Sequence, residues 1–200
     1  CAMAFIGMES LNQPSLRSVR KGHNSVGDYR TQFDRLRERG ILIFTGFMLG
    51  LDEDTPDYYQ TVPESLEKVD PSAVLISLSI PIPGTPFHDG LEREGRIFDH
   101  DLSHYEGDHL VFTPRTVTPA EVFEAFERIN SEFYAWKSIL RRWVRFTWTY
   151  LSRGAGHGTG LAIRFIRSIM LSGILLQLSN FQRHHAAHKV FGRARDVPRR

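Results

Sequence analysis

Three short groups of polar, glycine and proline residues follow apolar runs in the first 90 residues, where they could form a ligand-binding site. Glu9 and Ser10 follow the run 2–8. The runs 41–49 and 73–80 lead into Gly50-Leu51-Asp52-Glu53 and Pro83-Gly84-Thr85-Pro86. In parallel α/β proteins the ligand-binding residues lie at the carboxyl ends of the strands. Loops are also commonly polar, and strands commonly end at glycine or proline, so simple strand termination is the alternative.

The segments around these groups alternate between strand-like and helix-like patterns. The three apolar runs are nearly continuous, as expected of parallel strands that are buried on both faces. Ser25 with Asp28 predicts a capping box that opens a helix ending at Gly40. Thr55 opens a second helix, which Pro63 should bend or split. This alternation predicts right-handed parallel units and an α/β fold.

The composition is that of a folded protein, with 41% hydrophobic and 24% charged residues. Its net charge of +2 conceals an uneven distribution, because residues 141–200 carry 12 Lys or Arg and one acid, whereas residues 1–140 carry 13 basic and 22 acidic residues. This break predicts an organisational boundary and an anionic partner for the basic tail. The single cysteine, Cys1, excludes an internal disulfide framework and favours a reducing compartment, the cytoplasm.

The order and spacing of the three groups resemble the radical S-adenosylmethionine (radical SAM) enzymes, in the subgroup that carries an N-terminal cobalamin-binding domain. The matching segments are Phe5 to Ser10, the G-x-I-x-G-x-x-E-like run Gly46 to Glu53 with Met48 in place of Ile, and Pro83 to Pro86. They are similar to the fourth, fifth and sixth strands of that family's barrel. The resemblance covers roughly residues 1–145 and implies the C-terminal half of a partial (β/α)6 TIM-like barrel, followed by an α-helical extension.

The resemblance also implies roles for individual residues. Six positions would face SAM: Glu9, Ser10, Gly46, Met48, Gly50 and Glu53. The carboxylate of Glu9 could accept hydrogen bonds from the ribose hydroxyls or the amino group of SAM, and glycine would let the backbone approach the adenine. Glu53 would brace its loop. The substrate side of the barrel mouth would be formed by Ile82, Gly84, Thr85 and Phe87.

Two family features are absent, the three-cysteine loop that holds a 4Fe-4S cluster and the glycine-rich second-strand motif. One thiolate cannot hold a cluster, so we expect a C-terminal fragment that is inert by itself, with no catalytic residue or metal ligand of its own. Its partner would be the missing N-terminal half of the same polypeptide. The complete enzyme would cleave SAM reductively and transfer a methyl group to a small-molecule substrate, or carry out related radical chemistry, with the cluster and cobalamin as the implied cofactors.

Three regions are expected: the barrel half at 1–114, a long amphipathic helix packed on it at 115–152, and a glycine-rich linker with a basic helical tail at 153–200. A capping box from Thr118 to Glu121 opens the long helix. Its apolar stripe predicts packing against the barrel, with a coiled-coil seam as the alternative. The stripe comprises Val122, Phe126, Ile129, Phe133, Trp136, Leu140 and Trp143.

The tail suggests a second class of function. The glycine run 154–160 indicates a flexible linker, because no lysine stands where a phosphate loop requires one. The uncharged stretch 168–180 is too short to span a bilayer, so the segment 161–181 would either lie in a membrane interface or dock on the acidic body. The alternative function is therefore a non-catalytic, barrel-derived binding protein, tethered to the inner membrane face or another anionic partner. No nucleic-acid-binding module is recognisable.

The histidines lack the spacing of a metal site. His100, His104 and His109 lie among acidic residues in a segment that is typical of a solvated connecting loop. A second set, His184, His185 and His188, lies in the arginine-rich tail, where nearby carboxylates are absent and a surface position is expected.

Overall fold

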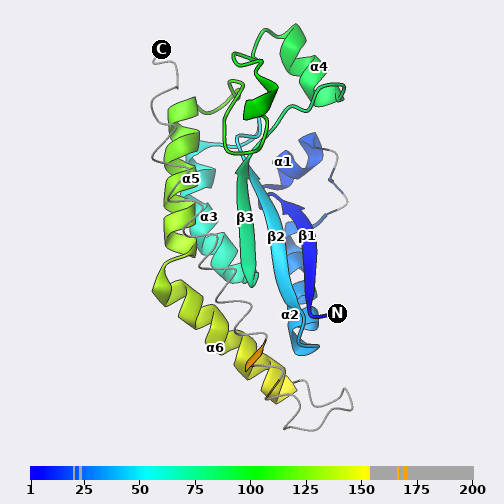
Figure 1. Ribbon diagram of the computed structural model, residues 1–200, viewed down its shortest axis with the longest axis vertical. Helices are drawn as coiled ribbons and strands as arrows, with labels where there is room; N and C mark the ends of the chain where they lie inside the picture. Colours follow the sequence, from blue (N-terminus) through cyan, green and yellow to red (C-terminus); the bar gives the residue numbers. More distant parts are fainter. Residues whose placement is uncertain (20, 23, 154–165, 167–168, 171–200) are drawn as a thin grey trace.

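The computed structural model describes residues 1–19, 21–22, 24–153, 166 and 169–170, which form an α/β fold (Figure 1). The strands are β1 (Met3–Glu9), β2 (Leu42–Leu49) and β3 (Ala73–Leu78). The α-helices are α1 (Gln13–Ser18), α2 (Tyr29–Glu38), α3 (Pro56–Val69), α4 (Pro86–Arg93), α5 (Pro119–Phe133) and α6 (Trp136–Arg153), with short 3-10 turns at Val26–Asp28 and Leu102–His104. The predicted α/β class is confirmed, and the partial barrel remains a prediction.

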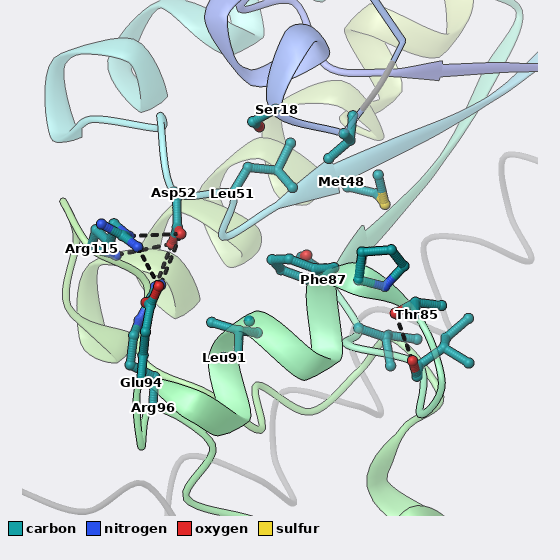
Figure 2. A pocket seen from close by; sticks show the side chains of 16 residues that line it. Ser18, Met48, Leu51, Asp52, Thr85, Phe87, Leu91, Glu94, Arg96 and Arg115 are labelled. Carbon is teal, nitrogen blue, oxygen red and sulfur yellow. Dashed lines mark hydrogen bonds and ion pairs between the residues drawn. The ribbon is translucent and has the colours of Figure 1, made fainter.

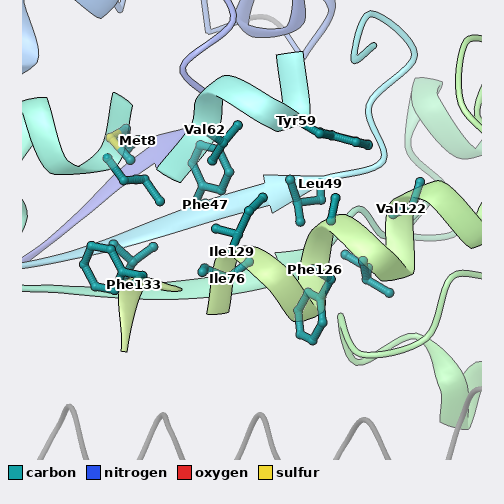
Figure 3. Close-up of a cluster of buried hydrophobic side chains, with 14 of the residues drawn as sticks. Met8, Phe47, Leu49, Tyr59, Val62, Ile76, Val122, Phe126, Ile129 and Phe133 are labelled. Carbon is teal, nitrogen blue, oxygen red and sulfur yellow. The ribbon is translucent and has the colours of Figure 1, made fainter. Parts of the chain in front are cut away.

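The sheet is parallel, has the order β1-β2-β3, and differs between its two faces. Helices α2, α3 and α5 cover one face, where Phe47 of β2, Ile76 of β3 and Ile129 of α5 belong to one buried cluster (Figure 3). Full burial of each such side chain contributes about 1.5–3 kcal/mol to stability. On the other face Phe5 and Leu75 are 59% and 37% exposed. In the part of the chain that the structure describes, this second face is uncovered.

Two predicted helix starts are confirmed and one is wrong. Thr55 Oγ1 accepts a hydrogen bond from the backbone N–H of Tyr58 at 3.1 Å. Thr118 and Glu121 form both halves of a capping box at the start of α5. Ser25 makes no side-chain capping hydrogen bond, because the 3-10 turn separates it from α2. A capping hydroxyl reaches only the N–H groups two or three residues ahead, so Ser25 cannot cap a helix that starts four residues later.

Pro63 lies inside α3 without splitting it. Proline has no N–H, so the carbonyl of Tyr59, four residues earlier, lacks its helical donor. That carbonyl instead accepts a hydrogen bond from Nη2 of Arg128 in α5 at 3.0 Å, and Nη1 of the same side chain contacts Gln60. Helix α5 thus supplies the donor that the proline removes from α3.

This contact gives a double-mutant prediction. Arg128→Met is expected to lower the free energy of unfolding by about 1–2 kcal/mol, because the Tyr59 carbonyl loses its donor. In a Pro63→Ala background the restored backbone N–H can bind that carbonyl, so the same substitution should cost less. Denaturant unfolding of the four proteins should give a coupling energy near ~1 kcal/mol. An equal cost in both backgrounds would contradict the assignment.

The single long helix predicted for residues 115–152 is wrong, because two helices occupy this region. At the break the Tyr134 hydroxyl accepts from the backbone N–H of Val74 at 3.0 Å and donates to its carbonyl at 2.5 Å. Arg142 donates from Nη1 to the Phe133 carbonyl at 2.8 Å, and its guanidinium lies 3.8 Å from the centroid of the Phe133 ring. These contacts attach the end of α5 to β3, and α6 runs in a different direction from α5.

The predicted apolar stripe is consequently buried in α5, whereas in α6 only its member Trp143 packs against the core, beside Leu42 and Phe146. Helix α5 buries Val122, Phe126, Ile129 and Phe133. In α6, by contrast, Trp136 and Leu140 are 59% and 56% exposed, and Tyr150 is among the side chains that are buried instead. The Tyr150 ring packs against Gly40, where φ is +67° and an added Cβ would lie 2.4 Å from the ring. The break thus changes which face of the amphipathic sequence is buried.

The predicted linker at 154–160, the apolar segment at 161–181 and the histidines at 184, 185 and 188 lie outside the described residues, apart from positions 166, 169 and 170. Among the helices that the structure does describe, none combines the length and apolarity needed to cross a bilayer.

Candidate functional site

A cavity of about 490 Å³ lies at the carboxyl end of the sheet, where α4 faces β2 and the segment after β3 (Figure 2). Its apolar wall includes Met48 of β2 and Phe87 and Leu91 of α4. Its polar wall contains Asp52 and Arg96. Parallel α/β proteins bind ligands at this end of the sheet, and the volume suits a small organic molecule.

Four charged side chains form the polar wall. Asp52 accepts hydrogen bonds from Nη1 of Arg96 at 2.8 Å and from Nε of Arg115 at 3.2 Å. Glu94 binds the same two arginines at 3.0 and 2.6 Å. Burial alone would raise the pKa of Asp52, but the hydrogen bonds and charges of the arginines outweigh it and lower that pKa. The wall is formally neutral, and the Arg115 side chain remains 59% exposed.

Asp54 is fully buried and ties the loop after β2 to two helices. Its carboxylate accepts hydrogen bonds from the Ser15 hydroxyl of α1 at 2.8 Å, the Leu51 backbone N–H at 3.1 Å and the Tyr59 hydroxyl of α3 at 3.3 Å. Burial raises the pKa of Asp54 to about 6, against the opposing effect of these hydrogen bonds. Asp54 therefore fixes the loop that carries Asp52 into the cavity wall.

Three predicted SAM positions, Glu9, Gly46 and Met48, share the uncovered face of the sheet. Glu9 lies at a bulge in β1 with φ of 66°, which non-glycine residues rarely adopt. Its carboxylate lies over Gly7, where an added Cβ would be 2.4 Å from Oε1, and pairs with Lys21 at 3.3 Å. Gly7 and Gly46 are register partners. Two adjacent strands therefore present bare backbone beside a carboxylate.

The other three predicted SAM positions lie in the supporting loops. Ser10 is fully buried, and its hydroxyl lies 3.1 Å from the Tyr58 hydroxyl. Gly50 has φ of +87°, so the turn itself requires glycine there. Glu53 is exposed, and the bracing role expected of it belongs to the buried Asp54. The structure thus brings three of the six positions together on one face.

Three of the four residues predicted for the substrate side line the cavity. Ile82, Thr85 and Phe87 line it together with Met48, so residues from the two predicted sets meet in one space. Thr85 also caps α4, which begins at the next residue. Gly84 has φ of +81° and shapes the turn before α4.

Sequence reasoning missed most of the polar wall. Arg96 and Arg115 lie 44 and 63 residues from Asp52, and Ser15 lies 39 residues from Asp54. Such partners meet only after the chain has folded. The available signal was the position of Asp52 directly after the strand end, in the segment where ligand-binding residues were expected.

The histidines of the loop after α4 pair with acidic neighbours. His104 Nδ1 lies 2.7 Å from Asp99 Oδ2, and its ring stacks on that of His109 with 4.5 Å between centroids. Within the described residues, no group of three histidine, cysteine or acidic side chains is arranged to hold a metal ion.

Comparison with known proteins relates the chain to methyltransferases, although no protein-family model matches it. It is 30% identical over 142 residues to bacteriochlorophyllide d C-12(1)-methyltransferase of Chlorobaculum tepidum, covering 71% of this chain and 31% of that protein. It is 30% identical over 107 residues to hopanoid C-2 methylase of Rhodopseudomonas palustris, with coverage of 54% and 20%. For bacteriochlorophyllide d C-8(2)-methyltransferase of Chlorobaculum tepidum the identity is 27% over 143 residues, with coverage of 71% and 32%.

The chain spans less than a third of the length of each of these curated relatives. In two of them the similarity covers 71% of this chain. The homologues of this chain are methyltransferases.

Proposed function

We propose that this chain is the C-terminal part of a radical SAM enzyme that methylates a carbon atom of an apolar ring compound. The observation that carries the proposal is the cavity, in which Met48 of the predicted SAM face meets Ile82, Thr85 and Phe87 of the predicted substrate side. The names of the relatives, which specify methylation at numbered C positions, support methyl transfer as the reaction.

The uncovered sheet face fits SAM on two grounds. Gly7 and Gly46 carry no side chains of their own, and the Glu9 carboxylate that lies over Gly7 is 19% exposed, enough to accept hydrogen bonds from a ligand. SAM bound there would supply the methyl group and the radical chemistry that the family resemblance implies. Glu9 would bind and orient it. The 4Fe-4S cluster does not fit this chain, because Cys1 is its only thiol, so cluster and cobalamin are assigned to another part of the polypeptide.

The cavity suits an apolar acceptor. Met48, Phe87 and Leu91 would pack against a ring system and exclude water from it. The half-exposed guanidinium of Arg115 could bind an acidic substituent through Nη1, because Asp52 and Glu94 occupy its Nε and Nη2 donors. The substrate proposed is therefore an apolar ring compound with an acidic group near one end.

The first test is the coding sequence upstream of Cys1. We expect a C-x-x-x-C-x-x-C loop preceded by a cobalamin-type domain. The complete protein, purified without oxygen and reconstituted with iron and sulfide, should then convert SAM to 5′-deoxyadenosine or S-adenosylhomocysteine in the presence of a reductant, as measured by mass spectrometry. Residues 1–200 alone are the matched control and should release neither product.

A start codon directly before Cys1 would contradict the proposal and favour the barrel-derived binding protein with a cationic tail. A complete protein that holds a cluster and leaves SAM intact would contradict it as well, because the cofactor would then be present without the reaction.

A further inference from the structure

Helix α6 contains all three tryptophans of the chain, Trp136, Trp143 and Trp148. It lies at the end of the molecule away from α4 (Figure 1), the helix that lines the cavity. One of its faces packs on the body through Ile139, Phe146 and Tyr150, which are all buried. The helix therefore approaches the body by one face only within the described part of the chain.

The opposite face is apolar and exposed. Leu140, Val144 and Trp148 follow one another at steps of four residues and are 56%, 51% and 73% exposed. We call these three side chains the outer face of α6. Large apolar side chains gathered on one exposed helix face mark an interaction surface. Tryptophan is enriched at membrane–water interfaces, because its ring is apolar and its N–H needs a polar partner.

The charge of α6 has one sign. Its 18 residues include five Lys or Arg and no acid. Arg141 and Arg145 bind Glu67 and Asp70 at the end of α3, which holds the helix on the body. Lys137 is exposed. The chain beyond α6 adds eight Lys or Arg and one acid, so positive charge continues past the helix.

The described residues beyond α6 are also apolar and exposed, with basic residues near them in the sequence. Ile166, Ile169 and Met170 are 59%, 59% and 67% exposed, and they are spaced as i, i+3 and i+4, the spacing of residues on one helix face. In the sequence Arg164 precedes them and Arg167 lies between Ile166 and Ile169. A second apolar set with basic neighbours therefore lies in the same region of the chain.

We propose that the outer face of α6 docks on an anionic membrane surface, lying in the plane of the interface. An amphipathic helix with apolar and aromatic residues on one face and basic residues beside them binds bilayers in this way. This assignment differs from the tail segment 161–181 expected from sequence, since it rests on α6 itself.

The positive charge of this region favours an anionic lipid surface over a second copy of the chain as the partner of the outer face. Pairing the outer face with that of a second copy would bring together two exposed Lys137 side chains and two basic segments that follow α6, and their like charges would repel. Anionic headgroups would instead attract Lys137 and the eight Lys or Arg beyond α6, at about 1 kcal/mol for each that lies near the surface. Membrane docking would also place the enzyme beside apolar substrates, although the inference does not depend on the proposed function.

The test uses the chain 1–200 and tryptophan emission, which reports on α6 alone because every tryptophan lies there. Vesicles of phosphatidylcholine with 30% phosphatidylglycerol, on the order of what anionic membranes contain, are compared with pure phosphatidylcholine. We expect cosedimentation and a blue shift with the anionic vesicles only. The variant L140Q/V144Q keeps all three tryptophans and should bind at least about tenfold more weakly. Leu102→Gln, at a leucine outside α6 that is 66% exposed, is the control and should bind as the wild type does.

Three results would overturn the inference. The first is a wild-type chain that ignores anionic vesicles. The second is a dimer that L140Q/V144Q dissociates, which would make a second copy the occupant. The third is emission that is already blue-shifted and protected from iodide in buffer, which would mean that later residues of the same chain cover the outer face.

Discussion

Replacing Asp54 by alanine is expected to lower the free energy of unfolding by about 3 kcal/mol at pH 4. The substitution leaves three buried donors without their acceptor, the Ser15 hydroxyl, the Leu51 N–H and the Tyr59 hydroxyl. Each buried unsatisfied group costs about 1–3 kcal/mol. The loop that carries Asp52 would lose its attachment to α1 and α3, so ligand binding in the cavity should weaken with it. Thermal unfolding followed by circular dichroism measures the loss.

The isosteric Asp54→Asn substitution tests the charge separately. The pKa of Asp54 is raised from 3.8 to about 6 in the folded state, so the folded protein binds this proton more tightly than the unfolded chain does. The resulting stability is fully present below pH 3.8 and is lost as the pH rises through 6. Relative to Asp54→Asn, the wild type should therefore lose about 2 kcal/mol between pH 4 and pH 8. Parallel pH profiles for the two proteins would show that the carboxyl titrates normally.

Replacing Glu9 by glutamine in the complete protein is expected to raise the dissociation constant for SAM by about tenfold or more. The substitution keeps the side-chain length and removes the charge that strengthens hydrogen bonds from ribose or ammonium groups. Gly7→Ala should act in the same direction, because its Cβ would occupy the place of Glu9 Oε1 and displace the carboxylate. Isothermal titration of SAM into the reconstituted protein measures both effects.

Glu64→Gln is the matched control for Glu9. Glu64 lies on the exposed side of α3, where it pairs with Lys68 and is distant from the sheet face in the fold. Unchanged SAM affinity in a folded Glu9→Gln protein would remove Glu9 from the binding site. The strained backbone of Glu9 would then need another explanation, such as the bulge that ends β1.

Short-range signals in the sequence predicted much of the scaffold. Thr55 and Thr118 cap their helices through hydrogen bonds to residues three positions ahead, so the pattern and the contact lie in the same few residues. The pattern of Ser25 and Asp28 shows the limit of such signals. These residues belong to the start and end of a 3-10 turn, and α2 begins only after that turn. Pro63 was expected to bend or split its helix, but α3 is continuous, and the donor that replaces the missing proline N–H comes from Arg128, 69 residues away.

For the site, the sequence determined the three strand-end groups, because alternating strands and helices bring the carboxyl ends of parallel strands to one edge. Tertiary structure decided which members of each group lie on the uncovered sheet face or line the cavity. Glu9 and Ser10 are neighbours, yet a bulge turns the first over the sheet and buries the second. Only folding could bring Arg96 and Arg115 to Asp52, or Ser15 to Asp54.

The sequence by itself also predicted helical, amphipathic structure within residues 115–152, although not its division into α5 and α6, because spacing and capping are local properties. It could not determine which apolar face of α6 is buried, since Trp136, Leu140 and Trp148 read like core residues as well as Ile139 and Phe146 do. The turn at Tyr134, anchored to Val74, decided this by rotating α6 relative to α5. Burial depends on what lies opposite a face, and only the tertiary structure places the opposing surface.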